Sequence, residues 1–265
     1  MANPKRRGRK FIGKRLFVAA VITTFFIGVL SGAAILSIST AKIPTSEASP
    51  LPILENGSVT RSIKIVSVRS DGSGMVTELA IELEKGTGRI LVDTSPLVGF
   101  DFQFAERTAV KVASEITGIA LDEDGIGLMG VDILFTVTMP KGQQVEIQAI
   151  DGPSAGAAAT ILTLAAFQNK KIKSDVIMTG TIQESHKIGL IGGVYAKAAA
   201  AKDNGASLFL VPKGQVVEVY RQVGPFSYTR YEPISYLQDY IKQQGWPLTI
   251  AEVSTVEQAA KLMLE

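Results

Sequence analysis

The sequence has no cysteine and a single histidine among its 265 residues. Without cysteine the chain can form no disulfide, no cysteine nucleophile and no thiolate metal site. A single imidazole also excludes, within one chain, any mechanism or zinc site that needs two histidines. We therefore expect no metal and no other cofactor, and we expect the apolar core alone to hold the fold together.

An excess of positive charge is found only at the N-terminus. Residues 1–15 carry seven lysines and arginines and no acid, although the net charge of the whole chain is only +2. Removing those seven charges leaves −5 for the rest, so the body offers no positive field for nucleic acid. We expect 1–15 to be a basic cytoplasmic tail and expect no nucleic-acid partner.

Uncharged residues form one long run near the N-terminus, from Leu16 to Ala41. Its apolar part, 16–38, would be about 35 Å long as a helix, which is enough to cross a hydrocarbon layer of about 30 Å. The basic residues before it favour a cytoplasmic N-terminus. We predict a single-pass anchor in the cell membrane with the rest of the chain extracytoplasmic. A cleaved signal peptide is the alternative, but its apolar region is usually shorter.

The remaining chain divides into a linker and one domain. Residues 39–60 hold three prolines and many small polar residues, which is typical of a tether. From residue 61 to 265, strand and helix patterns interleave without strict alternation, so we predict an α+β fold. Residues 220–247 contain five of the six tyrosines and the only tryptophan, and we predict that this segment is an insertion.

Periodicity locates the elements of this domain. The first three strands are expected to form an antiparallel sheet with one solvated face, because 75–84 alternates apolar and acidic residues. The last helix is expected to begin at Ser254-x-x-Glu257, which fits a capping box. The expected strands are 61–69, 75–84, 89–92, 131–137, 144–150, 175–180 and 207–212, and the expected helices include 102–118, a small-residue helix ending near 167, and 194–203.

Ser154 stands in the string AIDGPSAGAAAT, between a Gly-Pro kink and a run of small residues. The string fits G-x-S-x-G, the nucleophile elbow of α/β-hydrolases, but that fold needs a later acid and histidine. His186 is the sole candidate and lies in a polar loop. A Ser–Lys pair is the other way to activate a serine, and it needs a lysine whose pKa is lowered by burial among apolar residues. Lys197, between Ala196 and a run of alanines, meets that requirement.

Three motifs follow one another along the chain: DGPSAG at 151–156, MTG at 178–180 and GGVYAK at 192–197. Together they resemble the proteolytic domain of the Lon protease family, most of all its membrane-tethered archaeal type, over roughly 60–265. The resemblance implies a Lon-like fold, Ser154 as nucleophile and Lys197 as general base. It also implies hexameric rings, so we expect a homo-oligomer. The string TIQESHKIG departs from the family pattern. The resemblance therefore predicts neither the residues at this edge of the site nor a role for His186.

Five further residues take supporting roles by this resemblance: Thr179, Asp151, Gly152, Pro153 and Ala155. The hydroxyl of Thr179 is expected to help hold the lysine. Asp151 is expected to shape or gate the site, because a carboxylate turned toward the lysine would raise its pKa and oppose catalysis. Backbone amides between Gly152 and Ala155 are expected to stabilise an oxyanion.

The function expected from the sequence is a membrane-anchored, ATP-independent serine endopeptidase that acts through an acyl-enzyme on flexible peptides or unfolded chains. The family's ATPase has no counterpart here, since the one phosphate-loop-like string, at 8–15, has Arg15 where a hydroxyl should bind magnesium. The alternatives are a non-catalytic Lon-like scaffold that binds proteins, and a hydrolase of esters.

Overall fold

The computed structural model describes residues 57–138 and 149–265. The predicted tail at 1–15, the predicted anchor at 16–38 and nearly all of the predicted linker at 39–60 lie outside these ranges. Within them, no helix is both long enough and apolar enough to cross a bilayer.

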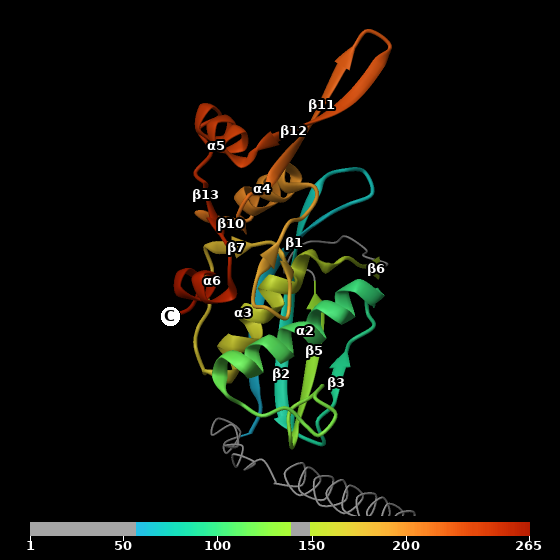
Figure 1. The fold of residues 1–265 in the computed structure, drawn as a ribbon, viewed down its shortest axis with the longest axis vertical. Coiled ribbons are helices and arrows are strands. Elements are labelled where there is room, and N and C mark those ends of the chain that lie inside the picture. The colour runs from blue at the N-terminus through green and yellow to red at the C-terminus, as the bar shows by residue number, and fades with distance from the viewer. Residues whose placement is uncertain (1–56, 139–148) are drawn as a thin grey trace, which may run out of the picture. The chain divides into compact units, whose positions relative to one another are not determined.

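The N-terminal half of the domain is built on a four-stranded sheet in the order β1-β2-β5-β3 (Figure 1). Its strands are β1 (Val59–Val68), β2 (Gly74–Lys85), β3 (Ile90–Val92) and β5 (Val131–Thr138). Apolar side chains at alternate positions of β2 are buried, as the pattern predicts. The expectation of a wholly antiparallel sheet is wrong, because β3 pairs parallel to β5 and makes no pair with β2.

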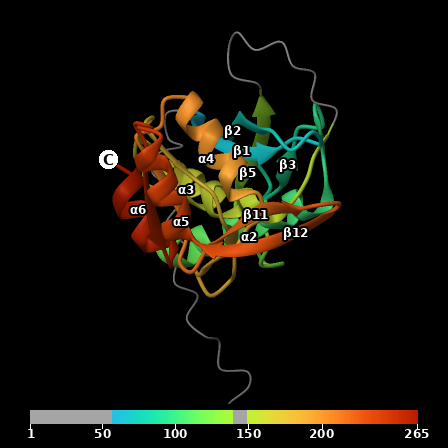
Figure 2. The same ribbon diagram turned by 90° about the horizontal axis from the view of Figure 1, so that it is seen from above.

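Two helices cover one face of this sheet (Figure 2). α3 (Gly156–Phe167) lies directly against β1 and β2, and α2 (Phe100–Thr117) packs on α3. Every residue of α3 is buried, so its many alanines let three layers of backbone approach closely. The short strands β4 (Leu97–Val98) and β6 (Ala149–Ile150) pair in parallel and connect these layers. Only these last two residues of the predicted strand 144–150 are described.

The C-terminal half contains a second sheet, which is parallel and has the order β13-β10-β7. Its strands are β7 (Val176–Met178), β10 (Leu208–Pro212) and β13 (Thr249–Val253), and α4 (Val194–Asp203) and α5 (Ile234–Gln243) share its core. A short hairpin of β8 (Thr181–Ile182) and β9 (Ile188–Gly189) follows β7. One antiparallel-rich half and one parallel half confirm the α+β class.

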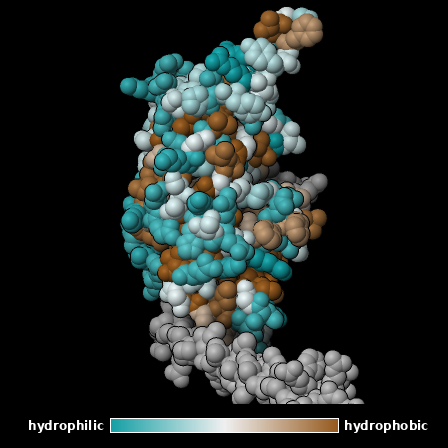
Figure 3. Space-filling view, in the orientation of Figure 1, coloured by the Kyte–Doolittle hydropathy of each residue, from teal (hydrophilic) through white to brown (hydrophobic). Residues whose placement is uncertain are grey.

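The aromatic segment 220–247 has two structural parts. β11 (Val216–Val223) and β12 (Phe226–Pro233) form a hairpin with an exposed, partly apolar end (Figure 3). α5 behaves differently, because Ile234, Leu237 and Ile241 are buried in the second core. The end of the hairpin lies outside the core, although Val217 at its base is buried in that core. Insertion of the whole segment stays a prediction.

The last helix, α6 (Val256–Met263), begins one residue later than the predicted capping box. Thr255 is the N-cap, and its hydroxyl accepts a hydrogen bond from the Gln258 amide at 3.4 Å. Ser254 lies before the helix, where its carbonyl accepts a hydrogen bond from Ile188 N and its amide donates one to Gln258 Oε1. The prediction of a Ser254–Glu257 box is wrong, since pairing with β9 holds Ser254 outside the helix.

Candidate active site

A tight turn between β6 and α3 presents Ser154. Gly152 has φ 105° and ψ 145°, a backbone conformation that is essentially confined to glycine. Pro153 then begins a single 3₁₀ turn, Pro153–Ala155, which continues directly into α3. The kinked Gly-Pro pair therefore places the serine immediately before a buried helix.

Backbone hydrogen bonds fix this turn to the loop after β7. Gly180 N donates to Ser154 O at 2.9 Å, and Ala157 N donates to Gly180 O at 3.0 Å. The Thr179 hydroxyl adds a bond to the same Ser154 carbonyl at 3.2 Å. The MTG motif thus has a structural role. Its Thr179 and Gly180, which follow β7 of the second sheet, hold the backbone of Ser154 in place.

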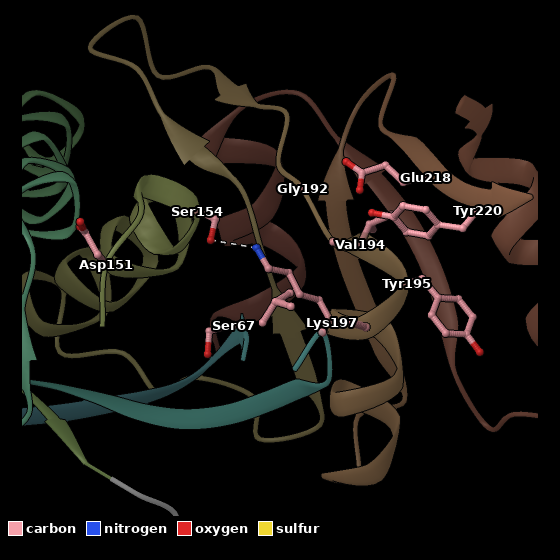
Figure 4. A pocket seen from close by; sticks show the side chains of 13 residues that line it. Ser67, Asp151, Ser154, Gly192, Val194, Tyr195, Lys197, Glu218 and Tyr220 are labelled. Carbon is pink, nitrogen blue, oxygen red and sulfur yellow. Dashed lines mark hydrogen bonds between the residues drawn. The ribbon is translucent and has the colours of Figure 1, made fainter. Parts of the chain in front are cut away.

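α4 carries Lys197 to the serine. Gly193 precedes the helix with φ 65°, and a side chain there would lie 2.6 Å from Val68 Cγ2, so only glycine allows α4 to approach β1 this closely. Lys197 is 4% exposed, and its Nζ lies 2.8 Å from Ser154 Oγ and 3.5 Å from Thr179 Oγ1. Figure 4 shows the side chain running from α4 to the serine hydroxyl. The structure thus brings the three predicted residues together.

Burial lowers the pKa of Lys197 to about 8. Desolvation is the sole cause, because no carboxylate in the described part of the chain stabilises the ammonium. A substantial fraction of the amine is therefore neutral in mildly alkaline solution and can accept a proton from the serine 2.8 Å away.

Asp151 faces away from the lysine. Its Oδ1 accepts a hydrogen bond from Phe102 N, in the first turn of α2, at 3.3 Å, and another from Gly152 N at 2.7 Å. Figure 4 places Asp151 on the far side of Ser154 from Lys197. In this state Asp151 caps α2 and shapes the turn, and the Gly152 amide is occupied, so it is not free as an oxyanion donor. A gating role for Asp151 stays a prediction.

The side chain of His186 contacts two carboxylates and not Ser154. Its Nδ1 lies 2.8 Å from Glu257 Oε1 and its Nε2 lies 3.1 Å from Glu115 Oε2, so both ring nitrogens are occupied away from Ser154. Hydrogen bonds to these two carboxylates raise the pKa of His186. The imidazole ties the β8–β9 hairpin to α2 and α6, and it does not serve Ser154. Among residues 57–138 and 149–265, no cluster of metal-binding side chains has suitable geometry.

The serine and lysine open onto a cleft of about 630 Å³. The motifs supply part of its lining, and the sequence did not indicate the rest, which comes from β1, the β1–β2 turn and β11, far from the motifs along the chain. No local pattern marks these residues, and only the tertiary fold assembles them. They are Ser67, Val68, Gly72, Glu218 and Tyr220.

A buried, carboxylate-free lysine in contact with a serine at a cleft defines the class: this is the geometry of a serine–lysine dyad. Sequence comparison finds a likeness to a known family. Residues 111–224, which include Ser154, Thr179 and Lys197, match the Lon protease (S16) C-terminal proteolytic domain. This part of the chain is therefore similar to the proteolytic domain of Lon proteases.

Individual Lon proteases show the same likeness. The chain is 29% identical over 167 residues to the Lon protease of Endomicrobium trichonymphae, covering 62% of this chain and 20% of that protein. It is 26% identical over 156 residues to the archaeal Lon protease of Methanocaldococcus jannaschii, covering 58% and 23%. It is 46% identical over 63 residues to the Lon protease of Malacoplasma penetrans, covering 24% and 8%. The match thus spans less than a quarter of these relatives.

Proposed function

We propose that this chain is a serine endopeptidase in which Lys197 activates Ser154. The 2.8 Å distance between Lys197 Nζ and Ser154 Oγ, with the amine 4% exposed, supports this most directly. A lysine that only stabilised the fold would have a carboxylate partner or reach water. Lys197 has neither in the described chain, and its lowered pKa suits a base.

The geometry supports an acyl-enzyme route. As Ser154 Oγ bonds to the substrate carbonyl carbon, its proton passes to Lys197 Nζ. The resulting ammonium gives that proton to the leaving nitrogen as the C–N bond breaks, which leaves an ester on Ser154. Water then attacks the ester and its proton passes to Lys197, and the resulting ammonium gives that proton to Ser154 Oγ as the C–O bond breaks. Thr179 keeps the amine and the serine backbone in place.

The substrates we propose are flexible peptides and unfolded protein chains, because the cleft must admit an extended backbone. We also propose that cleavage needs no ATP, since the acyl-transfer steps consume none and the string at 8–15 lacks the magnesium-binding hydroxyl. Adding ATP should leave the cleavage rate unchanged. Assembly into a homo-oligomer, a hexameric ring by resemblance to the family, is proposed as well and is measurable by light scattering.

We propose that the chain is anchored in the membrane by 16–38, with its N-terminus in the cytoplasm and the domain outside. The support is the 23-residue apolar run with seven basic residues before it. Protease added to intact cells should digest residues 61–265. Full protection of this domain until the cells are lysed would refute the orientation.

Active-site labelling tests the enzymatic proposal. A fluorophosphonate should label the wild-type chain, and Ser154→Ala should abolish both labelling and cleavage of unfolded casein. Ser67→Ala is the matched control, because Ser67 lines the same cleft and has no contact with Lys197 among the described hydrogen bonds. An unlabelled wild type would favour the non-catalytic scaffold. Turnover of activated esters without cleavage of casein would favour an ester hydrolase.

A further inference from the structure

The base of the β11–β12 hairpin forms the wall of the cleft opposite Ser154. Glu218 and Tyr220 both line the cavity that contains Ser154 and Lys197. They are two positions apart on β11, so their side chains leave the same face of the strand. Figure 4 shows both side chains extending from β11 toward Gly192, on the side that faces the serine.

Glu218 has no cationic partner within the described residues. It takes part in no ion pair and no side-chain hydrogen bond there, although it is partly buried. A partly desolvated carboxylate without a partner gains from a cation that enters the cleft. Its cross-strand neighbour is Tyr231, which supplies no charge.

The other two charged side chains of the cleft, Asp151 and Lys197, already have hydrogen-bond partners. Asp151 accepts two backbone amides at the start of α2 and at Gly152. Lys197 donates its hydrogen bonds to Ser154 and Thr179, and none joins it to Glu218 among the described residues. Glu218 therefore takes no part in the proton transfer, and its carboxylate can bind a cationic group of a ligand in the cleft.

Tyr220 adds a second element beside the carboxylate. Its side chain is 75% exposed, so the face of its ring is accessible. An aromatic face next to a carboxylate attracts an ammonium or guanidinium group, because the ring quadrupole and the carboxylate act on the same charge. The ring of Tyr195 is less available to a ligand than that of Tyr220. Its hydroxyl contacts the Tyr240 hydroxyl at 3.2 Å, and its ring packs on Tyr240.

We propose that Glu218 and Tyr220 bind a lysine or arginine side chain of the substrate, close to the bond that Ser154 attacks. The proposal rests on the peptidase function proposed above and adds its substrate class: basic peptides. Acidic residues at the same position are disfavoured, because they would meet the Glu218 carboxylate without a compensating cation. The expected preference for a basic over a neutral residue is about tenfold in kcat/KM.

The test uses the full-length chain and internally quenched peptides that differ at one position at a time near the cleavage site. In the wild type, lysine or arginine at one position should raise kcat/KM about tenfold over alanine, with glutamate poorest. Glu218→Gln should reduce this ratio to near one, and Glu218→Lys should reverse it in favour of glutamate. Tyr220→Phe should keep most of the preference and Tyr220→Leu should lose part of it. Glu84→Gln, an exposed carboxylate on β2 outside the cleft, is the matched control.

The outcomes separate this inference from the proposed function. A wild type that is labelled by fluorophosphonate and cleaves peptides, but shows no preference for basic residues, overturns the inference and leaves the peptidase intact. A preference that survives Glu218→Lys overturns the assignment to Glu218. Absence of labelling in the wild type removes the proposed function, and the inference with it.

Discussion

Replacing Lys197 by methionine should make the protein more stable at neutral pH while it abolishes activity. Methionine has nearly the same length and no charge, and the site is 4% exposed. Burial lowers the pKa of Lys197 from the ordinary 10.5 to about 8. That difference corresponds to about 3 kcal/mol of cost for the charged amine in the folded state.

The sign of the pH dependence follows from proton binding. Below pH 8 the amine is protonated in both the folded and the unfolded chain, so the folded state carries the whole cost. Between pH 8 and 10.5 the unfolded chain keeps the proton that the folded chain has released, so the stability of the wild type rises with pH. Above 10.5 both states are neutral and the cost is gone.

The variant also loses the hydrogen bonds to Ser154 and Thr179, which together are worth about 1 kcal/mol net. Lys197→Met should therefore exceed the wild type by about 2 kcal/mol at pH 7. This advantage should shrink by up to about 1.4 kcal/mol per pH unit above pH 8 and vanish near pH 10.

Urea unfolding of both proteins from pH 6 to 10.5 measures this difference. Other titrating groups cancel, because they are common to the two chains. Lys202→Met is the control: it removes a lysine from the same helix, where the amine contacts Asp203 at 2.7 Å and the Trp246 ring at 4.5 Å, and it should not reproduce this pH profile. A stability difference between Lys197→Met and the wild type that stays constant from pH 7 to 10.5 would refute the buried, neutral amine.

Three further predictions concern the same framework. Lys197→Arg should lose at least about a hundredfold in kcat/KM for peptides, because a guanidinium stays charged and cannot accept the serine proton; near-normal turnover would contradict the role of base. Hydrogen bonds to Glu257 and Glu115 raise the pKa of His186 above 6.5, so the stability that His186 contributes is present below pH 6.5 and is lost as pH rises through the raised value. The stability difference between wild type and His186→Gln should therefore shrink with rising pH in thermal unfolding, and growth of this difference would be the wrong sign. Gly152→Ala should destabilise the fold by about 1–3 kcal/mol and slow fluorophosphonate labelling, because alanine is strained at φ 105°; an unchanged labelling rate would show that the turn does not position Ser154.

Local sequence patterns predicted most of the elements and the proximity of Ser154 and Lys197. The helix expected at 194–203 has those bounds, and the strand alternation at 75–84 appears as burial on one face of β2. The motif order predicted that Ser154, Thr179 and Lys197 meet, which they do. These features succeed because helix periodicity, strand alternation and a three-part motif are each encoded in short segments.

The features that the sequence did not predict depend on contacts between distant segments. The parallel pairing of β3 with β5 joins residues more than forty positions apart, and a propensity pattern carries no information on direction. The same holds for Asp151 at the start of α2 and for Glu218 in the cleft wall. The capping error at Ser254 has a similar origin, since the carbonyl of that residue accepts a hydrogen bond from Ile188 in β9, far away along the chain.

A titration of Lys197 itself tests the central claim most directly. Lysines labelled with ¹³C at Cε can be followed by NMR from pH 6 to 12, and the resonance that is missing in Lys197→Met identifies the active-site amine. A midpoint at about pH 8 is predicted. A midpoint near 10.5, the value of an ordinary solvated lysine, would contradict the assignment of Lys197 as the neutral base of Ser154.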